Sequence, residues 1–276
     1  MRWDRNYSSS EVEDRRGDAP IAGGGGVPLW GILRLFSLFG WKGTAVGLVL
    51  AGALVVGSRI MGGGGGETRV GHAPISQSAQ EDELAHFVGF VFDDVQTSWR
   101  AQMPGYRDAH LVLFRRATRS GCGTATMAVG PFYCPVDRKV YIDLSFYDEL
   151  RRKLGAPGDF AQAYVIAHEV GHHVQNQLGL LRDQMNHSIE IELQADCLAG
   201  AWAKDAERRG ELETGDLDEA LNAATQIGDD TLQRREQGYV QPETWTHGSS
   251  AQRRGSFQRG YDGGPSACGV SLQPAR

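Results

Sequence analysis

Two histidines and a glutamate occur within one five-residue stretch, His168-Glu169-Val170-Gly171-His172. Residues four apart lie on one face of an α-helix, so the imidazoles of His168 and His172 can bind a single zinc ion. Glu169 stands one position further round the helix, where its carboxylate can reach a water on that ion without binding the metal. This spacing predicts a Zn²⁺ site in which Glu169 is the catalytic general base.

A catalytic zinc ion takes three protein ligands and keeps its fourth position for water. The segment IEIELQAD, residues 189–196, offers acidic side chains for the third ligand. Glu192 and Asp196 are four residues apart, so we expect Glu192 to bind the metal and Asp196 to accept the outer N–H of a ligand histidine. Glu190 is a poorer ligand because it points elsewhere. The alternative is that these acids form a solvated helix face.

Two helices are expected to position these side chains. Residues 159–178 carry apolar residues at helical spacing and contain no proline, and Gly179 follows them. Asp159 can cap this helix, with Gln162 three residues later in capping-box position. The second helix is predicted to start after Ser188 and to end at Gly210.

The region before these helices mixes one helix with short strands. Apolar residues at helical spacing predict an amphipathic helix over residues 81–102. Residues 111–114 form a short strand candidate, and alternating apolar and polar side chains predict a strand over residues 140–146. The second strand could offer its edge to an extended polypeptide. No strand pattern follows residue 147.

Composition divides the chain into four segments. Residues 1–26 are polar and charged and are predicted to be a disordered cytoplasmic tail. Residues 27–61 are apolar and predict a membrane anchor, with one spanning helix at about residues 43–61. Residues 62–80 form a glycine-rich linker, and residues 81–276 form the catalytic domain. A cleaved signal peptide and a buried core helix are the alternatives for the anchor.

The charges around the predicted span indicate its direction. More basic residues precede the span than follow it, so the positive-inside rule places the N-terminus in the cytoplasm and the catalytic domain in the periplasm or outside the cell. The preceding basic residues are Arg2, Arg5, Arg15, Arg16, Arg34 and Lys42. The formal net charge is −6, which gives no sign of a nucleic-acid partner.

All four cysteines follow the predicted anchor, on the oxidising side of the membrane. Of the three possible pairings, we favour Cys122–Cys134, which closes a short loop, and Cys197–Cys268, which ties the C-terminal tail to a helix. A structural zinc site is less favoured because no C-x-x-C spacing occurs. A free, buried Cys197 remains the alternative for that residue.

The HEVGH motif and the later ELQAD segment together resemble the gluzincin arrangement of metallopeptidases. Over nearly its whole length, the chain resembles the bacterial neutral zinc metallopeptidase family. The matching stretches are MRWDRNYSSSEVEDRRG, CGTATMAVGPFYCPVDRKVYIDLSFYDEL, AYVIAHEVGHHVQNQLG, ELQADCLAGAWA and THGSSAQRRGSFQRGY. The resemblance implies a single N-terminal membrane segment and a zinc peptidase domain. We therefore expect a mostly helical α+β, zincin-like domain with a small sheet.

The resemblance also implies a downstream histidine or tyrosine that stabilises the oxyanion during peptide hydrolysis. His247, in the polar stretch THGSS, is the first candidate, although it could equally be an ordinary loop histidine. Arg253 and Tyr141 are the reserve candidates. His173 is expected to face away from the metal pair, and His187 could bind metal only if Glu192 does not.

These expectations lead to a membrane-anchored zinc peptidase of the bacterial cytoplasmic membrane, acting on polypeptides in the cell envelope. The first rival is a non-catalytic, zinc-stabilised envelope protein that scaffolds or binds other proteins. Such a protein would need the three ligands but not Glu169. The second rival is a zinc hydrolase that cleaves cell-wall peptide cross-links.

Overall fold

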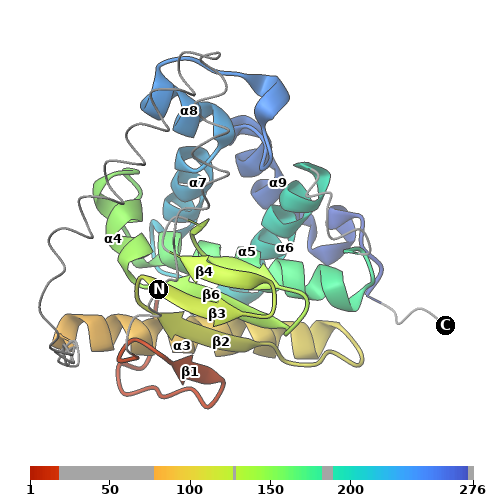
Figure 1. Ribbon diagram of the computed structural model, residues 1–276. Helices are drawn as coiled ribbons and strands as arrows, with labels where there is room; N and C mark the ends of the chain where they lie inside the picture. Colours follow the sequence, from red (N-terminus) through yellow and green to blue (C-terminus); the bar gives the residue numbers. More distant parts are fainter. Residues whose placement is uncertain (19–77, 127–128, 182–188, 273–276) are drawn as a thin grey trace, which may run out of the picture. The chain divides into compact units, whose positions relative to one another are not determined.

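The computed structural model describes residues 1–18, 78–126, 129–181 and 189–272. Its main sheet has the strand order β1-β2-β6-β5 (Figure 1). Strand β2 runs parallel to both β1 and β6, whereas β5 is antiparallel to β6. The strands are β1 (Val12–Asp14), β2 (His110–Phe114), β5 (Phe132–Cys134) and β6 (Lys139–Asp143). A separate antiparallel hairpin pairs β3 (Ala117–Ser120) with β4 (Gly123–Thr126).

Helices make up most of the remaining described chain, so the predicted α+β class with a small sheet is confirmed. The α-helices are α3 (Ala79–Gln102), α4 (Ser145–Arg152), α5 (Asp159–Gln177), α6 (Ile189–Arg208), α7 (Asp216–Gln226), α8 (Asp229–Gln237) and α9 (Ser250–Gly263). Two short 3₁₀ helices are η2 (Pro242–Thr244) and η3 (Pro265–Cys268). Among the described residues, no helix combines the length and the hydropathy that crossing a bilayer requires.

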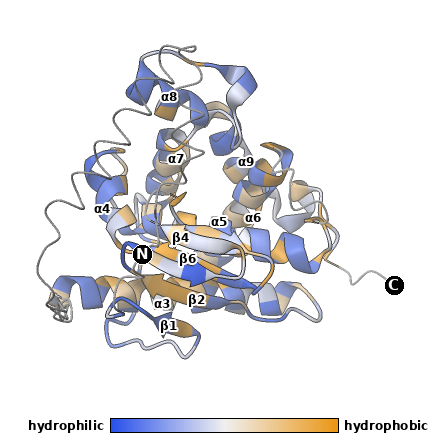
Figure 2. Ribbon diagram, viewed as in Figure 1, coloured by the Kyte–Doolittle hydropathy of each residue, from blue (hydrophilic) through white to orange (hydrophobic). Residues whose placement is uncertain are grey.

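The two faces of the main sheet belong to different clusters of buried side chains. Strand β2 is hydrophobic along most of its length (Figure 2), and successive side chains of a strand point to opposite faces. Leu111 and Leu113 join the core that α3 and α5 share, whereas Val112 and Tyr141 pack on the other face beside Ala125 of β4. The sheet thus has its helices, including the one with the HEVGH motif, on one face.

Several predicted elements are confirmed, and one strand prediction is wrong at its end. The helix predicted at 81–102 and the strand predicted at 111–114 correspond to α3 and β2. Strand β6 ends at Asp143, because its carboxylate accepts hydrogen bonds from the backbone N–H and hydroxyl of Ser145 and the chain turns into α4. Strand β6 also lies between β2 and β5, so it offers no free edge to a substrate.

The prediction of a disordered N-terminal tail is wrong for residues 1–18. Strand β1 adds to the edge of the sheet beside β2. The Trp3 ring packs edge-on against Phe87 of α3 at 5.3 Å between centroids, and the Tyr7 hydroxyl donates to Asp93 at 2.9 Å. Composition missed this docking because a few aromatic and charged side chains, rather than an apolar run, hold the segment. Residues 19–77, including the predicted span and most of the linker, lie outside the described residues.

The N-terminal segment belongs to the same compact unit as most of the described chain. Residues 1–20 and 74–276 belong to one compact unit. The predicted placement of these parts relative to a membrane stays a prediction.

Candidate metal centre

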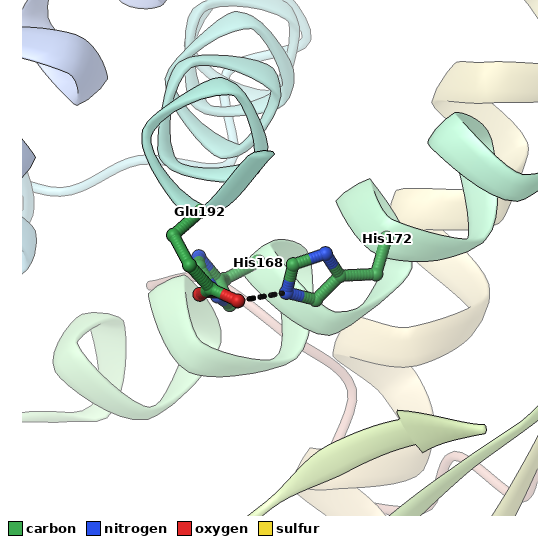
Figure 3. A group of neighbouring side chains, drawn as sticks. All are labelled: His168, His172 and Glu192. Carbon is green, nitrogen blue, oxygen red and sulfur yellow. Dashed lines mark ion pairs between the residues drawn. The ribbon is translucent and has the colours of Figure 1, made fainter. Parts of the chain in front are cut away.

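The HEVGH motif lies in the middle of α5, which packs against the first half of α6. Gly171 makes this approach possible, because a Cβ atom there would lie 3.1 Å from the backbone oxygen of Ala195 on α6. The helix pair places His168 and His172 opposite Glu192, and their ligand atoms lie within 4.8 Å of one another (Figure 3). All three side chains are buried.

The distances within this group fit a tetrahedral zinc ion. The His168 Nε2 atom is 3.2 Å from Glu192 Oε2, and the His172 Nε2 atom is 3.6 Å from Glu192 Oε1. Two ligand atoms that are each about 2.0–2.2 Å from a tetrahedral zinc lie roughly 3.3–3.6 Å apart. Two imidazoles and one carboxylate are also the donor set of several catalytic zinc sites.

His168 is held by the buried carboxylate of Asp196, as predicted. Its Nδ1 atom lies 2.8 Å from Asp196 Oδ1, which leaves Nε2 for the metal. Tyr164 and Arg253 also donate to Asp196, with the tyrosine hydroxyl at 2.6 Å and the guanidinium Nε and Nη2 atoms at 2.9 Å. Burial alone would raise the pKa of Asp196, but Arg253 and His168 outweigh burial and lower this pKa to about 2. Asp196 is therefore a carboxylate.

His172 is oriented by Gln175, a residue that sequence reasoning missed. The His172 Nδ1 atom lies 2.8 Å from Gln175 Oε1. The Gln175 amide donates in turn to the backbone oxygen of Ile191 at 2.8 Å and to the side chain of Gln194 at 3.0 Å. The clue in the sequence is the spacing, since Gln175 follows His172 by three residues and so shares its helix face. Both histidines thus present Nε2 to Glu192.

Glu169 lies beside the group of His168, His172 and Glu192, and its carboxylate has no hydrogen-bond or ion-pair partner among the other described side chains. The residue is 7% exposed, and no hydrogen bond or ion pair to it occurs among the described residues. Tyr147 of α4 lies near Glu169. The pKa of the Tyr147 hydroxyl is raised mainly by burial and, to a smaller extent, by the charge of Glu169. Within the described chain this buried hydroxyl also lacks a hydrogen-bond partner. Sequence reasoning did not identify Tyr147.

The three candidates for the oxyanion donor have different environments. The His247 side chain is 51% exposed, and its Nδ1 atom lies 3.3 Å from Asp229 Oδ1. Arg253 is buried, with its guanidinium on Asp196, so its first role is to support that carboxylate. Tyr141 is excluded as a donor, because it lies on the sheet face opposite the helices and donates to Asp137.

His173 points away from the metal ligands, as predicted, but it is fully buried and does not face solvent. Its Nδ1 atom lies 2.9 Å from the Tyr133 hydroxyl, and its Nε2 atom lies 2.7 Å from the backbone oxygen of Arg107. Burial lowers the pKa of His173 to about 4. A neutral His173 thus ties β5 to α5. Glu190 is exposed, and His187 lies outside the described residues.

The start of α5 differs from the predicted cap. Its N-cap residue is Gly158, and Glu219 of α7 accepts the Phe160 N–H at 3.0 Å. Asp159, the predicted cap, instead accepts hydrogen bonds from the α-amino group of Met1 at 3.0 Å. That amino group also pairs with Asp216 at 3.2 Å. Groups distant in sequence therefore fix the first turn of the helix that carries the HEVGH motif.

The C-terminal helix α9 carries Arg253 and packs closely on α6. A Cβ atom at Gly200 of α6 would lie 1.9 Å from the backbone oxygen of Phe257, and one at Gly260 would lie 1.8 Å from that of Cys197. The two predicted disulfides, Cys122–Cys134 and Cys197–Cys268, are both confirmed. The second one links α6 to η3, directly after α9, so it helps to keep Arg253 beside Asp196.

Comparison with known proteins agrees with this site. Residues 1–270 match the family described as "Putative neutral zinc metallopeptidase". The uncharacterized protein YpfJ of Escherichia coli (strain K12) is 44% identical over 300 residues, which cover 97% of this chain and 98% of that protein. The uncharacterized protein Rv2575 of Mycobacterium tuberculosis (strain H37Rv) is 43% identical over 195 residues, 64% of this chain and 67% of that protein. No solved structure gives a significant match. Since the family match covers nearly the whole chain, the protein belongs to this zinc metallopeptidase family.

Proposed function

We propose that the protein is a zinc-dependent peptidase that hydrolyses polypeptides in the bacterial cell envelope. The observation that carries this proposal is the group of His168, His172 and Glu192, whose ligand atoms lie within 4.8 Å, beside a Glu169 carboxylate that is free to act on water. A protein that used zinc only for stability would have no use for a buried, unengaged glutamate. Burying such a group without a partner is costly, which favours a catalytic role.

In the proposed hydrolysis, each of these side chains has a separate role. His168, His172 and Glu192 would hold a zinc ion, which would serve as a Lewis acid for the scissile carbonyl and would lower the pKa of a bound water toward about 7. Glu169 accepts the proton of the attacking water and passes it to the leaving amine. Asp196 and Gln175 hold the outer nitrogens of the two histidines, so both imidazoles keep Nε2 directed at Glu192.

His247 is the proposed donor to the oxyanion. Its Nδ1 atom is engaged by Asp229 and by the Thr246 hydroxyl at 2.9 Å, which leaves Nε2 for a substrate oxygen. The next residue, Gly248, lies close to the start of α6, because a Cβ atom there would be 3.1 Å from Ile189. The His247 loop is therefore beside the helical turn that carries Glu192.

Strand β5 is the proposed binding edge for an extended polypeptide. It is one of the two outer strands of the described main sheet, in contrast to β6. Tyr133 of β5 contacts His173 and Asn176 of α5, so this edge runs beside the active-site helix. A peptide added to β5 would satisfy the unpaired backbone groups of the strand. The two disulfides support placement of the domain in an oxidising compartment such as the periplasm.

The test compares the full-length wild type with Glu169→Gln. Zinc content is measured by mass spectrometry, and both proteins are incubated with a mixed peptide library and with cell-wall peptide fragments. We expect one zinc in each protein, and peptide cleavage that falls by about 10²–10⁴-fold in the variant, which loses general-base catalysis. Glu236→Gln, at an exposed position on α8, is the matched control and should cleave like the wild type.

The other outcomes separate the rival functions. If both proteins bind zinc and neither cleaves any substrate, the scaffold function replaces the enzyme. If only wall fragments are cleaved, the enzyme is a wall hydrolase that requires the same Glu169. If Glu169→Gln cleaves peptides as fast as the wild type, the proposed role of Glu169 is wrong.

A further inference from the structure

The amide of Gln175, which orients His172, is engaged at both its oxygen and its nitrogen. Its Oε1 atom lies 2.8 Å from His172 Nδ1, and its Nε2 atom donates to the backbone oxygen of Ile191 at 2.8 Å and to Gln194 Oε1 at 3.0 Å. A backbone oxygen only accepts hydrogen bonds, so the Gln175 nitrogen must face Ile191 and its oxygen must face His172. His172 Nδ1 is therefore the protonated nitrogen, and Nε2 keeps the lone pair that a metal ion needs.

Gln194 of α6 extends this series of hydrogen bonds to the C-terminal turn. Its Nε2 atom donates to the backbone oxygen of Cys268 in η3 at 3.0 Å. That oxygen is again only an acceptor, so the Gln194 amide has a single orientation as well, with its oxygen toward Gln175. The hydrogen bonds all run in one direction, from the imidazole N–H of His172 through the two amides to the Cys268 oxygen. Hydrogen bonds that are aligned in this way strengthen one another.

The Cys268 oxygen at the end of this series is held in place by two kinds of contact. The disulfide Cys197–Cys268 joins η3 to α6, and Cys197 follows Gln194 by three residues, so both lie on one face of the helix. The turn begins directly after α9, which packs on α6 so closely that a Cβ atom at Gly260 would lie 1.8 Å from the Cys197 backbone oxygen. Gln194 and its acceptor are therefore fixed relative to each other.

Burial makes the loss of this arrangement costly. Gln175 is fully buried. Without Gln194, one buried N–H of Gln175 would lose its acceptor, and an unsatisfied buried donor costs more than an ordinary hydrogen bond contributes. The amide of Gln175 would then be held by Ile191 and His172 alone.

We propose that Gln194 is a positioning residue of the metal centre, which acts through Gln175 to keep His172 Nε2 directed at Glu192 and a bound zinc ion. The C-terminal turn η3 supports His172 in this way, whereas Asp196 supports His168 directly. The inference rests on the proposed zinc centre, but it does not depend on hydrolytic activity.

The zinc affinities of four full-length proteins test this pathway, namely the wild type, Gln194→Met, Gln175→Met and the double variant. Methionine keeps the length of the side chain and removes the hydrogen bonds, and competition with a chromogenic chelator gives each affinity. We expect Gln194→Met to bind zinc about 3–10-fold more weakly than the wild type. This loss is smaller than the one of about 10–100-fold expected when the direct partner of a zinc-binding histidine is removed. Gln237→Met, at an exposed position on α8, is the control and should bind zinc like the wild type.

The double variant separates this role from a general structural one. If Gln194 acts through Gln175, adding Gln194→Met to Gln175→Met should change the zinc affinity by less than about twofold. An equal loss in both backgrounds would overturn the proposal, because Gln194 would then affect the site by another route. A wild type that binds no zinc would overturn the metal centre itself and this inference with it. A wild type that binds zinc no more tightly than Gln194→Met would overturn this inference alone.

Discussion

At the scale of single residues, the two histidines proposed to bind zinc are held by different kinds of partner. His168 relies on a carboxylate that Tyr164 and Arg253 also contact, whereas His172 relies on a neutral amide, Gln175. The carboxylate makes its imidazole the stronger donor to a metal, while the amide mainly sets the orientation of the ring. The amide also joins α5 to α6 through the backbone oxygen of Ile191, next to Glu192.

Replacing Gln175 should weaken zinc binding without removing a ligand. Gln175→Met keeps the length of the side chain but loses the hydrogen bonds to His172 and to Ile191. Partners of this kind are worth about 10–100-fold in metal affinity, and we expect a loss in that range. Competition with a chromogenic chelator measures the affinity. Gln237→Met, at an exposed position on α8, is the control. Equal affinity in Gln175→Met and the wild type would show that Gln175 has no such role.

At the scale of elements, glycines set how closely the helices approach. Gly171 lets α5 meet α6, and Gly200 and Gly260 let α6 meet α9. The first contact positions Glu192 against the histidines, and the second positions Arg253 against Asp196. The spacing of apolar residues in the sequence predicted both helices, and the spacing of His168, His172 and Glu192 placed these three side chains together. Sequence reasoning could not identify Gly171 as more than a spacer within the motif, because its role depends on Ala195, twenty-four residues away.

An alanine at Gly200 should separate α9 from α6. Its Cβ atom would lie 1.9 Å from the backbone oxygen of Phe257, and the backbone cannot be moved as cheaply as a flexible side chain. We expect the free energy of unfolding to fall by about 1–3 kcal/mol, and zinc affinity to fall with it. Gly255→Ala on α9 is the matched control, because nothing lies within 4 Å of its added Cβ. Urea unfolding should show that control unchanged or stabilised by about 0.5–1 kcal/mol. Equal stability of Gly200→Ala and Gly255→Ala would contradict this account.

At the scale of the whole molecule, the sequence predicts the structure around the HEVGH motif well and the structure of the N-terminal segment poorly. The metal site was predicted from local patterns, namely the spacing within HEVGH and the acidic residues after Ile189. Both disulfide pairings were predicted because four cysteines allow only three pairings. The docking of β1 could not be predicted in this way. It depends on contacts such as those of Trp3 with Phe87 and Arg16 with Glu81, which join positions far apart in sequence. The charged, polar composition of residues 1–18 therefore led to a prediction of disorder.

The closeness of residues 18 and 78 predicts that the segment between them can be replaced. We consider a chain in which a ten-residue Gly-Ser linker, able to span up to about 33 Å, joins residue 18 to residue 78. It should bind one zinc and melt within a few degrees of the full-length protein. A chain of residues 78–276 should melt at least about 5 °C lower. Losing β1 should lower the free energy of unfolding by more than about 1–2 kcal/mol, and each kcal/mol shifts the Tm by roughly 2–4 °C at this size. Equal melting temperatures would show that residues 1–18 contribute nothing to the fold.

The central claim is that one zinc ion is bound by His168, His172 and Glu192. Native mass spectrometry of the full-length wild type, Glu192→Gln and Glu190→Gln tests it most directly. Glu190 is the matched control, since it is exposed and stands two residues from the proposed ligand on the same helix. We predict one zinc in the wild type and in Glu190→Gln, both stable to a mild chelator, and loss of the metal from Glu192→Gln under the same conditions. Retention of zinc by Glu192→Gln, or its equal loss from both variants, would contradict the assignment of this site.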